Sequence, residues 1–271
     1  MKKKYKILVL SDLKESTSTT LKSTINLATM INGEIDLFYV KKPTEIIEND
    51  NQLSAVRSIN EKHAHIERTI QDIVEPISKA HDIKVDYSFS FGNVKNEIEN
   101  YIKASKPDIV VLGKRKSKVF NFAGDSITHF VLNRYNGVVV IASDSMALEV
   151  NEGLSLGILN STGETINVDF AKDLLSHSQE PLKSFRIVKN STEFSEGETG
   201  GNRAMIEYVF EKRNNAVRNL SKYLTKSNIN LLCIDRNKSS DSNSNLMQSD
   251  IKEVINKLNV SLMFGSEKFS M

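Results

Sequence analysis

Two short segments of the chain carry residue types that bind charged ligands. The first is Ser11-Asp12, which directly follows the apolar run Tyr5–Leu10. The second begins at Gly113 and ends at Gly124-Asp125-Ser126, and its basic residues are Lys114, Arg115, Lys116 and Lys118. A glycine-containing loop before a helix favours anions, because free backbone N–H groups and the helix dipole both attract negative charge. The two segments therefore predict a site for a small anionic ligand.

Other chemistries lack the residues that they need. The chain contains no Gly-x-x-x-x-Gly-Lys-Ser/Thr phosphate loop and no Gly-x-Ser-x-Gly nucleophile turn. His63 and His65 are two positions apart on a predicted helix and point to different faces, which argues against a shared metal site. We therefore expect no catalytic residue and no metal ion, and we predict a binding or regulatory module.

The elements that would position these segments alternate between strands and helices. Short apolar, β-branched runs predict strands at Tyr5–Leu10, Ile35–Val40, Lys84–Phe91, Ile109–Leu112 and Val138–Ala142. Apolar residues at helical spacing predict helices at Glu15–Ile31, Leu53–Ala80, Val94–Ile102 and Ser126–Leu132. Pro76 is a place where the second of these helices is expected to kink or end. This order predicts a mostly parallel α/β sheet with helices on both faces, in which ligands bind beyond the carboxyl ends of the strands.

The second half of the chain repeats the first. Tyr101-Ile102 corresponds to Tyr223-Leu224, Ile109–Leu112 to Leu231–Ile234, and Val138–Ala142 to Val260–Phe264, each at an offset of 122 residues. The strand Asp36–Lys41 is matched by Ser184–Lys189, and Tyr87-Ser88-Phe89 by Tyr208-Val209-Phe210 after a shift of one residue. A constant offset with matched residue types indicates an internal duplication. We therefore predict two domains, residues 1–144 and 145–271, each with a five-stranded open sheet.

The loop chemistry is not repeated. After the predicted strand Leu231–Ile234 comes the run Asp235–Asn245, which is rich in Ser and Asn and contains no glycine. Such a run favours turns and does not form a rigid phosphate cradle. The first strand of this half ends at Asn160-Ser161 and lacks an acidic partner. We expect a structural role for the second domain.

The first half resembles the universal stress protein family. The resemblance lies in Lys6–Asp12, Asp108–Gly113 and Ser126–Leu132, and the tandem arrangement is also familiar in that family. It implies the adenine-nucleotide α-hydrolase-like fold and a role in the stress response. In ATP-binding members, Asp12 and Val40 would contact ribose and adenine, Gly113 and Ser126 would lie along the phosphates, and Leu112, Ile127 and Thr128 would line the pocket.

Several residues depart from the family pattern. Leu10 and Lys14 stand where the family tends to have Pro and Ser, and Lys116 replaces the second glycine of the loop. Asp125 separates Gly124 from Ser126, and an acidic side chain near a phosphate would cost about 1 kcal/mol in water and about 4 kcal/mol near a protein surface. We expect a degraded nucleotide site in the first domain and none in the second. The alternative is a functional ATP or AMP site, with slow ATP hydrolysis, that uses Asp12, Gly113 and the basic loop Lys114–Lys118.

Charge and composition limit the partners and the compartment. The formal net charge of +2 gives no general reason to bind nucleic acid or a membrane surface. The apolar run Ile7–Leu10 is shorter than a signal peptide requires, and a single cysteine, Cys233, cannot form an intramolecular disulfide, so we expect a cytoplasmic protein. The resemblance implies a pseudo-dimer with Val138–Ala142 beside Val260–Phe264, which would cover two edge strands. A homodimer of whole chains is left open.

Overall fold

The structure is a computed structural model, and it describes residues 5–42, 52–114, 127–144, 147–148, 153–159, 170–179, 181–188, 205–211, 215–234 and 248–265. The strands of the first half are β1 Tyr5–Ser11, β2 Gly33–Lys41, β3 Val85–Phe91, β4 Ile109–Gly113 and β5 Val138–Ala142. Those of the second half are β6 Leu156–Leu159, β7 Leu182–Val188, β8 Met205–Glu211, β9 Leu231–Ile234 and β10 Ser261–Phe264. The helices are α1 Ser16–Ile31, α2 Gln52–His81, α3 Val94–Ser105, α4 Ile127–Arg134, α5 Ala171–Ser176, α6 Ala216–Lys226 and α7 Gln248–Lys257.

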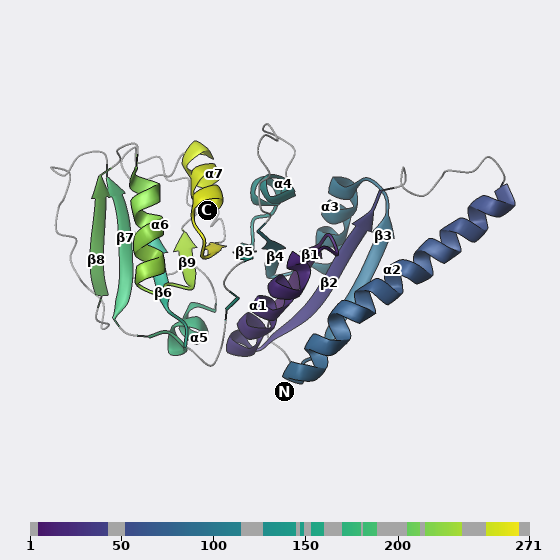
Figure 1. Cartoon of the computed structure of the whole chain (residues 1–271), viewed down its shortest axis with the longest axis horizontal. Coiled ribbons are helices and arrows are strands. Elements are labelled where there is room, and N and C mark those ends of the chain that lie inside the picture. The colour runs from purple at the N-terminus through teal and green to yellow at the C-terminus, as the bar shows by residue number, and fades with distance from the viewer. Residues whose placement is uncertain are drawn as a thin grey trace.

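In the described part of the chain, ten strands form one sheet in the order β3-β2-β1-β4-β5-β10-β9-β6-β7-β8 (Figure 1). The strands are parallel within each half, as the sequence predicts. One apolar core joins a face of the sheet to α1, α2 and α5, and a second core joins the other face to α3, α4, α6 and α7. Because both faces are covered, the central strands are apolar at nearly every position.

The two predicted sheets are continuous with each other. β5 and β10 pair in antiparallel fashion, with Val140 opposite Met263 and Ile141 opposite Leu262. The final strands of the two halves therefore lie side by side, as expected. This pairing removes the free edge that each half would have if it stood alone.

The strand pairing corrects the spacing of the repeat. Ile109 pairs with Val138 in the first half, and its counterpart Leu231 pairs with Ser261, so the last strand is shifted by one residue from the spacing found in the sequence. Val140 and Met263 then hold equivalent positions, and they lie opposite each other. β5 and β10 therefore pair around a local two-fold axis, as identical partners do in a symmetric dimer.

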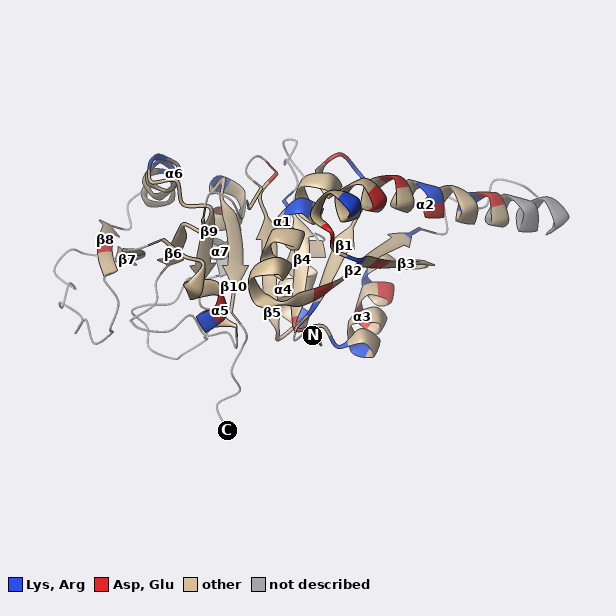
Figure 2. Ribbon diagram, turned by 90° about the horizontal axis from the view of Figure 1, so that it is seen from below, with Lys and Arg blue, Asp and Glu red and all other residues tan. Residues whose placement is uncertain are grey.

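Helix α2 differs from its prediction at its end. It runs to His81 and contains Pro76, so it does not end at the proline. Its buried stripe of Ile66, Ile70, Val74 and Ile77 packs on the sheet and holds the helix in place. Figure 2 shows both acidic and basic residues along the described part of α2. No described helix combines the length and the apolar character needed to cross a membrane.

Candidate functional site

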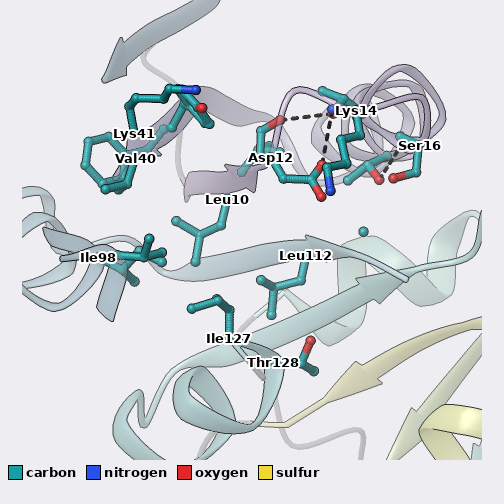
Figure 3. Close-up of a pocket in the computed structure, with 18 of the residues that line it drawn as sticks. Leu10, Asp12, Lys14, Ser16, Val40, Lys41, Ile98, Leu112, Ile127 and Thr128 are labelled. Carbon is teal, nitrogen blue, oxygen red and sulfur yellow. Dashed lines mark hydrogen bonds between the residues drawn. The ribbon is translucent and has the colours of Figure 1, made fainter. Parts of the chain in front are cut away.

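A cavity of about 450 Å³ opens beyond the carboxyl ends of β1, β2 and β4 (Figure 3). β1 lies between β2 and β4, so the chain leaves β1 toward one side of the sheet and later returns on the other side. In parallel α/β sheets this reversal leaves a crevice between the connecting loops, and ligands bind there. The cavity therefore lies where the strand order predicts a site.

Most of the predicted site residues meet in this cavity. Seven of them line it: Leu10, Asp12, Val40, Leu112, Gly113, Ile127 and Thr128. The other three, Lys116, Gly124 and Ser126, lie outside the described residues. Residues from two separate segments of the sequence are thus brought together by the pairing of β1 with β4.

The floor of the cavity is apolar. Leu10 of β1, Leu112 of β4 and Ile127 of α4 lie close together in Figure 3, with Ile98 of α3 beside them. All four belong to the core that covers this face of the sheet or pack against it. Such a surface suits a flat apolar group, because burying it removes apolar area from water.

The rim of the cavity carries positive charge that the sequence reasoning missed. Lys14, Lys41 and Lys42 line it, and Asp12 is the one acidic residue among the described residues that do so. Lys41 and Lys42 end β2 and follow it, so the same rule that selected Ser11-Asp12 could have found them. The described rim therefore favours an anionic group.

The turn after β1 is held by local hydrogen bonds. The Leu13 backbone N–H donates to the Ser11 Oγ at 3.0 Å, and the Lys14 N–H donates to the Asp12 Oδ1 at 3.2 Å. Leu13 has a φ of 55°, in the left-handed region that a bulky residue rarely adopts. Its side chain packs against the core under α1, which supports the strained turn. The turn places Asp12 and Lys14 on the cavity rim.

Gly113 has a packing reason to be glycine. A Cβ built on this residue would lie 2.5 Å from the Thr20 Oγ1 of α1. Thr20 is buried, and its hydroxyl donates to the Ser16 backbone oxygen at 2.9 Å. The absence of a side chain at Gly113 therefore allows α1 to pack closely against the end of β4.

The described residue of the basic loop turns away from the cavity. Lys114 is not among the residues that line it, and its Nζ donates to the backbone oxygen of Leu258 in the second half. Burial lowers the pKa of the Lys114 ammonium, and the nearby charge of Asp144 partly opposes this change. Residues 115–118 lie outside the described residues. Lys114 is therefore engaged with the other half of the molecule.

A half-buried polar cluster supports the cavity wall from α3. The Tyr101 hydroxyl donates to the Asp36 Oδ2 at 2.5 Å and accepts from the Ser88 Oγ at 2.8 Å. The Tyr101 ring stacks on Phe38, which lines the cavity, with centroids 4.0 Å apart and planes 10° from parallel. Burial is the main reason why the pKa of the Asp36 carboxyl is raised, and it also raises the pKa of Tyr101 to about 12. These contacts fix the Phe38 ring.

The second half fills the corresponding place with aromatic rings. Leu159 pairs with Phe185 as Leu10 pairs with Phe38, so Phe185 holds the position of Phe38. By the same pairing Tyr208 holds the position of Ser88, so the matches predicted from the sequence for Asp36–Lys41 and for Tyr87-Ser88-Phe89 are each wrong by one residue. Its ring lies 5.6 Å from Tyr208 and 5.8 Å from Tyr223. In the described parts of this half, the polar cluster around Asp36 thus has a packed aromatic group as its counterpart.

Histidines and acidic residues do not gather into a metal site in the described part of the chain. His63 lies against Phe89 on β3, with ring centroids 4.5 Å apart. Its ring is engaged with an aromatic neighbour on the edge strand β3, two strands away from β1.

Comparisons with known proteins agree with this architecture. The chain matches the solved structure of a universal stress protein from Archaeoglobus fulgidus DSM 4304 with a TM-score of 0.66 and 14% identity, over 96% of this chain and 98% of that chain. It matches a functionally unknown protein from Pseudomonas aeruginosa PAO1 with a TM-score of 0.56 and 11% identity, over 97% and 92% of the two chains. At these identities the likeness shows the fold alone, and it extends over both halves.

The sequence itself also matches a family. No curated protein gives a significant match to the chain. The model of the universal stress protein family, however, matches residues 5–142, which are just over half of the chain and include the described cavity. The chain belongs to the universal stress protein family.

Proposed function

We propose that this protein is a non-catalytic binding protein of the stress response, and that its first half takes an adenine nucleotide, ATP or AMP, in the cavity beyond β1 and β4. The observation that carries the proposal is the lining of the cavity, which combines an apolar floor with the basic rim of Lys14, Lys41 and Lys42. Its volume of about 450 Å³ lies in the range of small-molecule sites. Nucleotides have this same combination of a flat base and an anionic tail.

The residues of the cavity have distinct parts in this proposal. Leu10, Val40 and Ile127 would cover the base, and the Asp12 carboxylate would accept hydrogen bonds from ribose hydroxyls. The lysine ammonium groups would balance the charge of the phosphates as point charges. A glycine-rich loop binds phosphates through backbone N–H groups, whereas these lysines would bind them through their side chains. The proposal therefore does not depend on a glycine at position 116.

Calorimetry with ATP, ADP and AMP tests the proposal. We expect Lys14→Met to weaken ATP binding by about three- to tenfold and AMP binding less, because fewer phosphate charges lose a partner. Lys84→Met is the matched control, since Lys84 is 80% exposed beside Asp86 and does not line the cavity. Wild-type protein that binds none of the three nucleotides would overturn the proposal, and accumulation of ADP from ATP would overturn its non-catalytic part.

The sequence also favours a second candidate, a nucleotide site that has decayed. Lys116 and Asp125 stand where the family resemblance calls for glycine and for an uninterrupted Gly-Ser pair. The double variant Lys116→Gly/Asp125→Gly restores the family pattern at these positions. If the wild-type protein is silent in calorimetry and the double variant binds ATP, this second candidate replaces the first.

We further propose that residues 1–144 and 145–271 are two domains that form a pseudo-dimer within one chain, with a structural role for the second. The pairing of β5 with β10 around a local two-fold axis supports this division. Because each of these strands already has its partner, a homodimer of whole chains would use another surface. Light scattering of the purified protein measures whether such a homodimer forms.

A further inference from the structure

The end of strand β4 is attached to the second half of the molecule at the edge of the cavity. Gly113 lines the cavity, and Lys114 follows it directly. The Lys114 backbone N–H donates to the Ala142 oxygen at 2.8 Å, which continues the pairing of β4 with β5. The Lys114 side chain then crosses to the second half and donates to the Leu258 oxygen. One residue is thus held from two directions.

The partner of Lys114 suits a cation. Leu258 immediately follows α7, and its N–H still bonds to the Val254 oxygen at 3.0 Å, so its carbonyl lies at the carboxyl end of the helix. The carboxyl end of a helix carries partial negative charge, which stabilises a positive group nearby. Lys114 is half-buried, so this contact is less screened by solvent than a surface ion pair.

Further hydrogen bonds join the halves beside this contact. The Ser143 Oγ donates to the Asn259 backbone oxygen at 2.9 Å, and the Ser143 N–H donates to the Ser261 Oγ at 3.1 Å. Ser143 directly follows β5, whose last residue, Ala142, pairs with Gly113. The carboxyl ends of β4 and β5 are therefore fixed to the segment between α7 and β10. The cavity wall at Gly113 belongs to this fixed unit.

We propose that Lys114 is a positioning residue of the nucleotide site, through which the second half holds the cavity wall at the end of β4. The inference rests on the proposed function, because it concerns the same cavity. Lys114 does not touch the nucleotide; it keeps Gly113 in the position that lines the nucleotide cavity. The second half, which has lost the loop chemistry, thereby serves the site of the first. By linkage, a bound nucleotide must strengthen the contact between the halves by the same factor.

The test uses the full chain with three substitutions. Lys114→Met removes the charge and keeps most of the length of the side chain. Lys114→Arg keeps a cation that can reach the Leu258 carbonyl, and Lys84→Met is the exposed control. In the absence of nucleotide, we expect amide hydrogen exchange to become faster in residues 109–114 and 251–264 of Lys114→Met. The exchange rate of these residues should be unchanged in the control Lys84→Met and should return toward the wild-type rate in Lys114→Arg.

Nucleotide binding supplies the second measurement. We expect Lys114→Met to weaken the binding of ATP and of AMP by the same factor, about three- to tenfold, because a positioning residue affects both ligands alike. In wild type, ATP should slow exchange in residues 251–264, although these residues lie outside the cavity, and Lys114→Met should abolish this slowing. Lys114→Arg should restore both effects.

The outcomes separate this inference from the proposed function. If wild type binds ATP and AMP, and Lys114→Met binds them equally well, Lys114 is no positioning residue and the inference alone fails. A loss that is much larger for ATP than for AMP, without a change of exchange in the ligand-free protein, would mean that Lys114 contacts phosphate directly, and it would also overturn the inference. If wild type binds neither nucleotide, the proposed function fails and this inference fails with it.

Discussion

Gly113 controls how closely helix α1 can approach the end of β4. We predict that Gly113→Ala lowers the free energy of unfolding by about 1–3 kcal/mol, because its Cβ would meet the buried Thr20 hydroxyl. Thr20→Ala removes that hydroxyl, so the double variant should recover most of the loss. Urea unfolding of the two single variants and the double variant gives the coupling free energy between positions 113 and 20. If the two effects simply add, the close packing of Thr20 on Gly113 is not the cause.

The Asp36 carboxyl makes stability depend on pH. Burial raises its pKa above the ordinary value of 3.8, although the hydrogen bond from Tyr101 opposes the change. The folded state therefore holds the proton more tightly than the unfolded state, and the free energy of unfolding falls as pH rises through the range between the two pKa values. Asp36→Asn removes this pH-dependent loss of stability, because asparagine does not titrate, and it keeps an acceptor for the Tyr101 hydroxyl.

We therefore expect Asp36→Asn to have a higher melting temperature than wild type at about pH 7, and this difference to shrink toward about pH 4. Calorimetric melting of both proteins across this range measures the difference directly. Asp86→Asn on the neighbouring strand is a useful comparison, because Asp86 contributes to the raised pKa only through its charge. If the melting temperatures of Asp36→Asn and wild type differ by the same amount at every pH, protonation of Asp36 is not the cause of the difference.

The apolar residues of the site and Asp12 were predicted from the sequence, whereas Lys41 and Lys42 were missed although the same rule selects them. Leu10 and Leu112 are the next-to-last residues of their strands and Asp12 follows β1, and the rule for parallel sheets places such positions at one edge. Lys114 also directly follows a strand, but its long side chain reaches the second half. Nothing in the sequence near Lys114 indicates Leu258, because that contact depends on how the two halves pack.

At the scale of elements, helix α2 contains a proline that costs it a hydrogen bond. Pro76 has no N–H to donate to the Asp72 oxygen, yet the helix continues to His81. We predict that Pro76→Ala raises the free energy of unfolding by about 1–2 kcal/mol, since it restores this bond in a helix whose other side is buried. Glu75→Ala, which removes an exposed pair with Lys79, should change stability by less than about 0.5 kcal/mol. Urea unfolding measures both; an unchanged Pro76→Ala protein would mean that the helix already accommodates the proline without cost.

The order and type of the elements followed from the sequence, but the register of the repeat did not. Val138–Ala142 is apolar at every position and is buried on both faces of the sheet. Alternation of apolar and polar residues normally reveals which residues share a face, and a slip by one residue then becomes visible. Where every position is apolar that signal disappears, so the sequence comparison missed the shift of one residue that the pairing of Val138 and Ser261 reveals.

At the scale of the whole molecule, the antiparallel pair of β5 and β10 makes one sheet out of two halves. Val140 and Met263 face each other at its centre, and both are buried. The strands beyond them are parallel and belong to one half or the other, so this pair is the link at which the two halves of the sheet can separate. The polar contacts of Lys114 and Ser143 lie at one end of the same link.

A charge at the centre of this link should separate the halves without removing their individual sheets. We predict that Val140→Asp lowers the melting temperature and produces larger species in size-exclusion chromatography, because separated β5 and β10 would present free edges to other copies. Val140→Ala is the matched control: it leaves a small cavity that costs about 1–3 kcal/mol, but it keeps the backbone pairing and the elution volume. If Val140→Asp elutes and melts like Val140→Ala, the halves are held together by contacts other than this strand pair. The hydrogen bonds of Ser143 to Asn259 and Ser261 would then be the next contacts to remove.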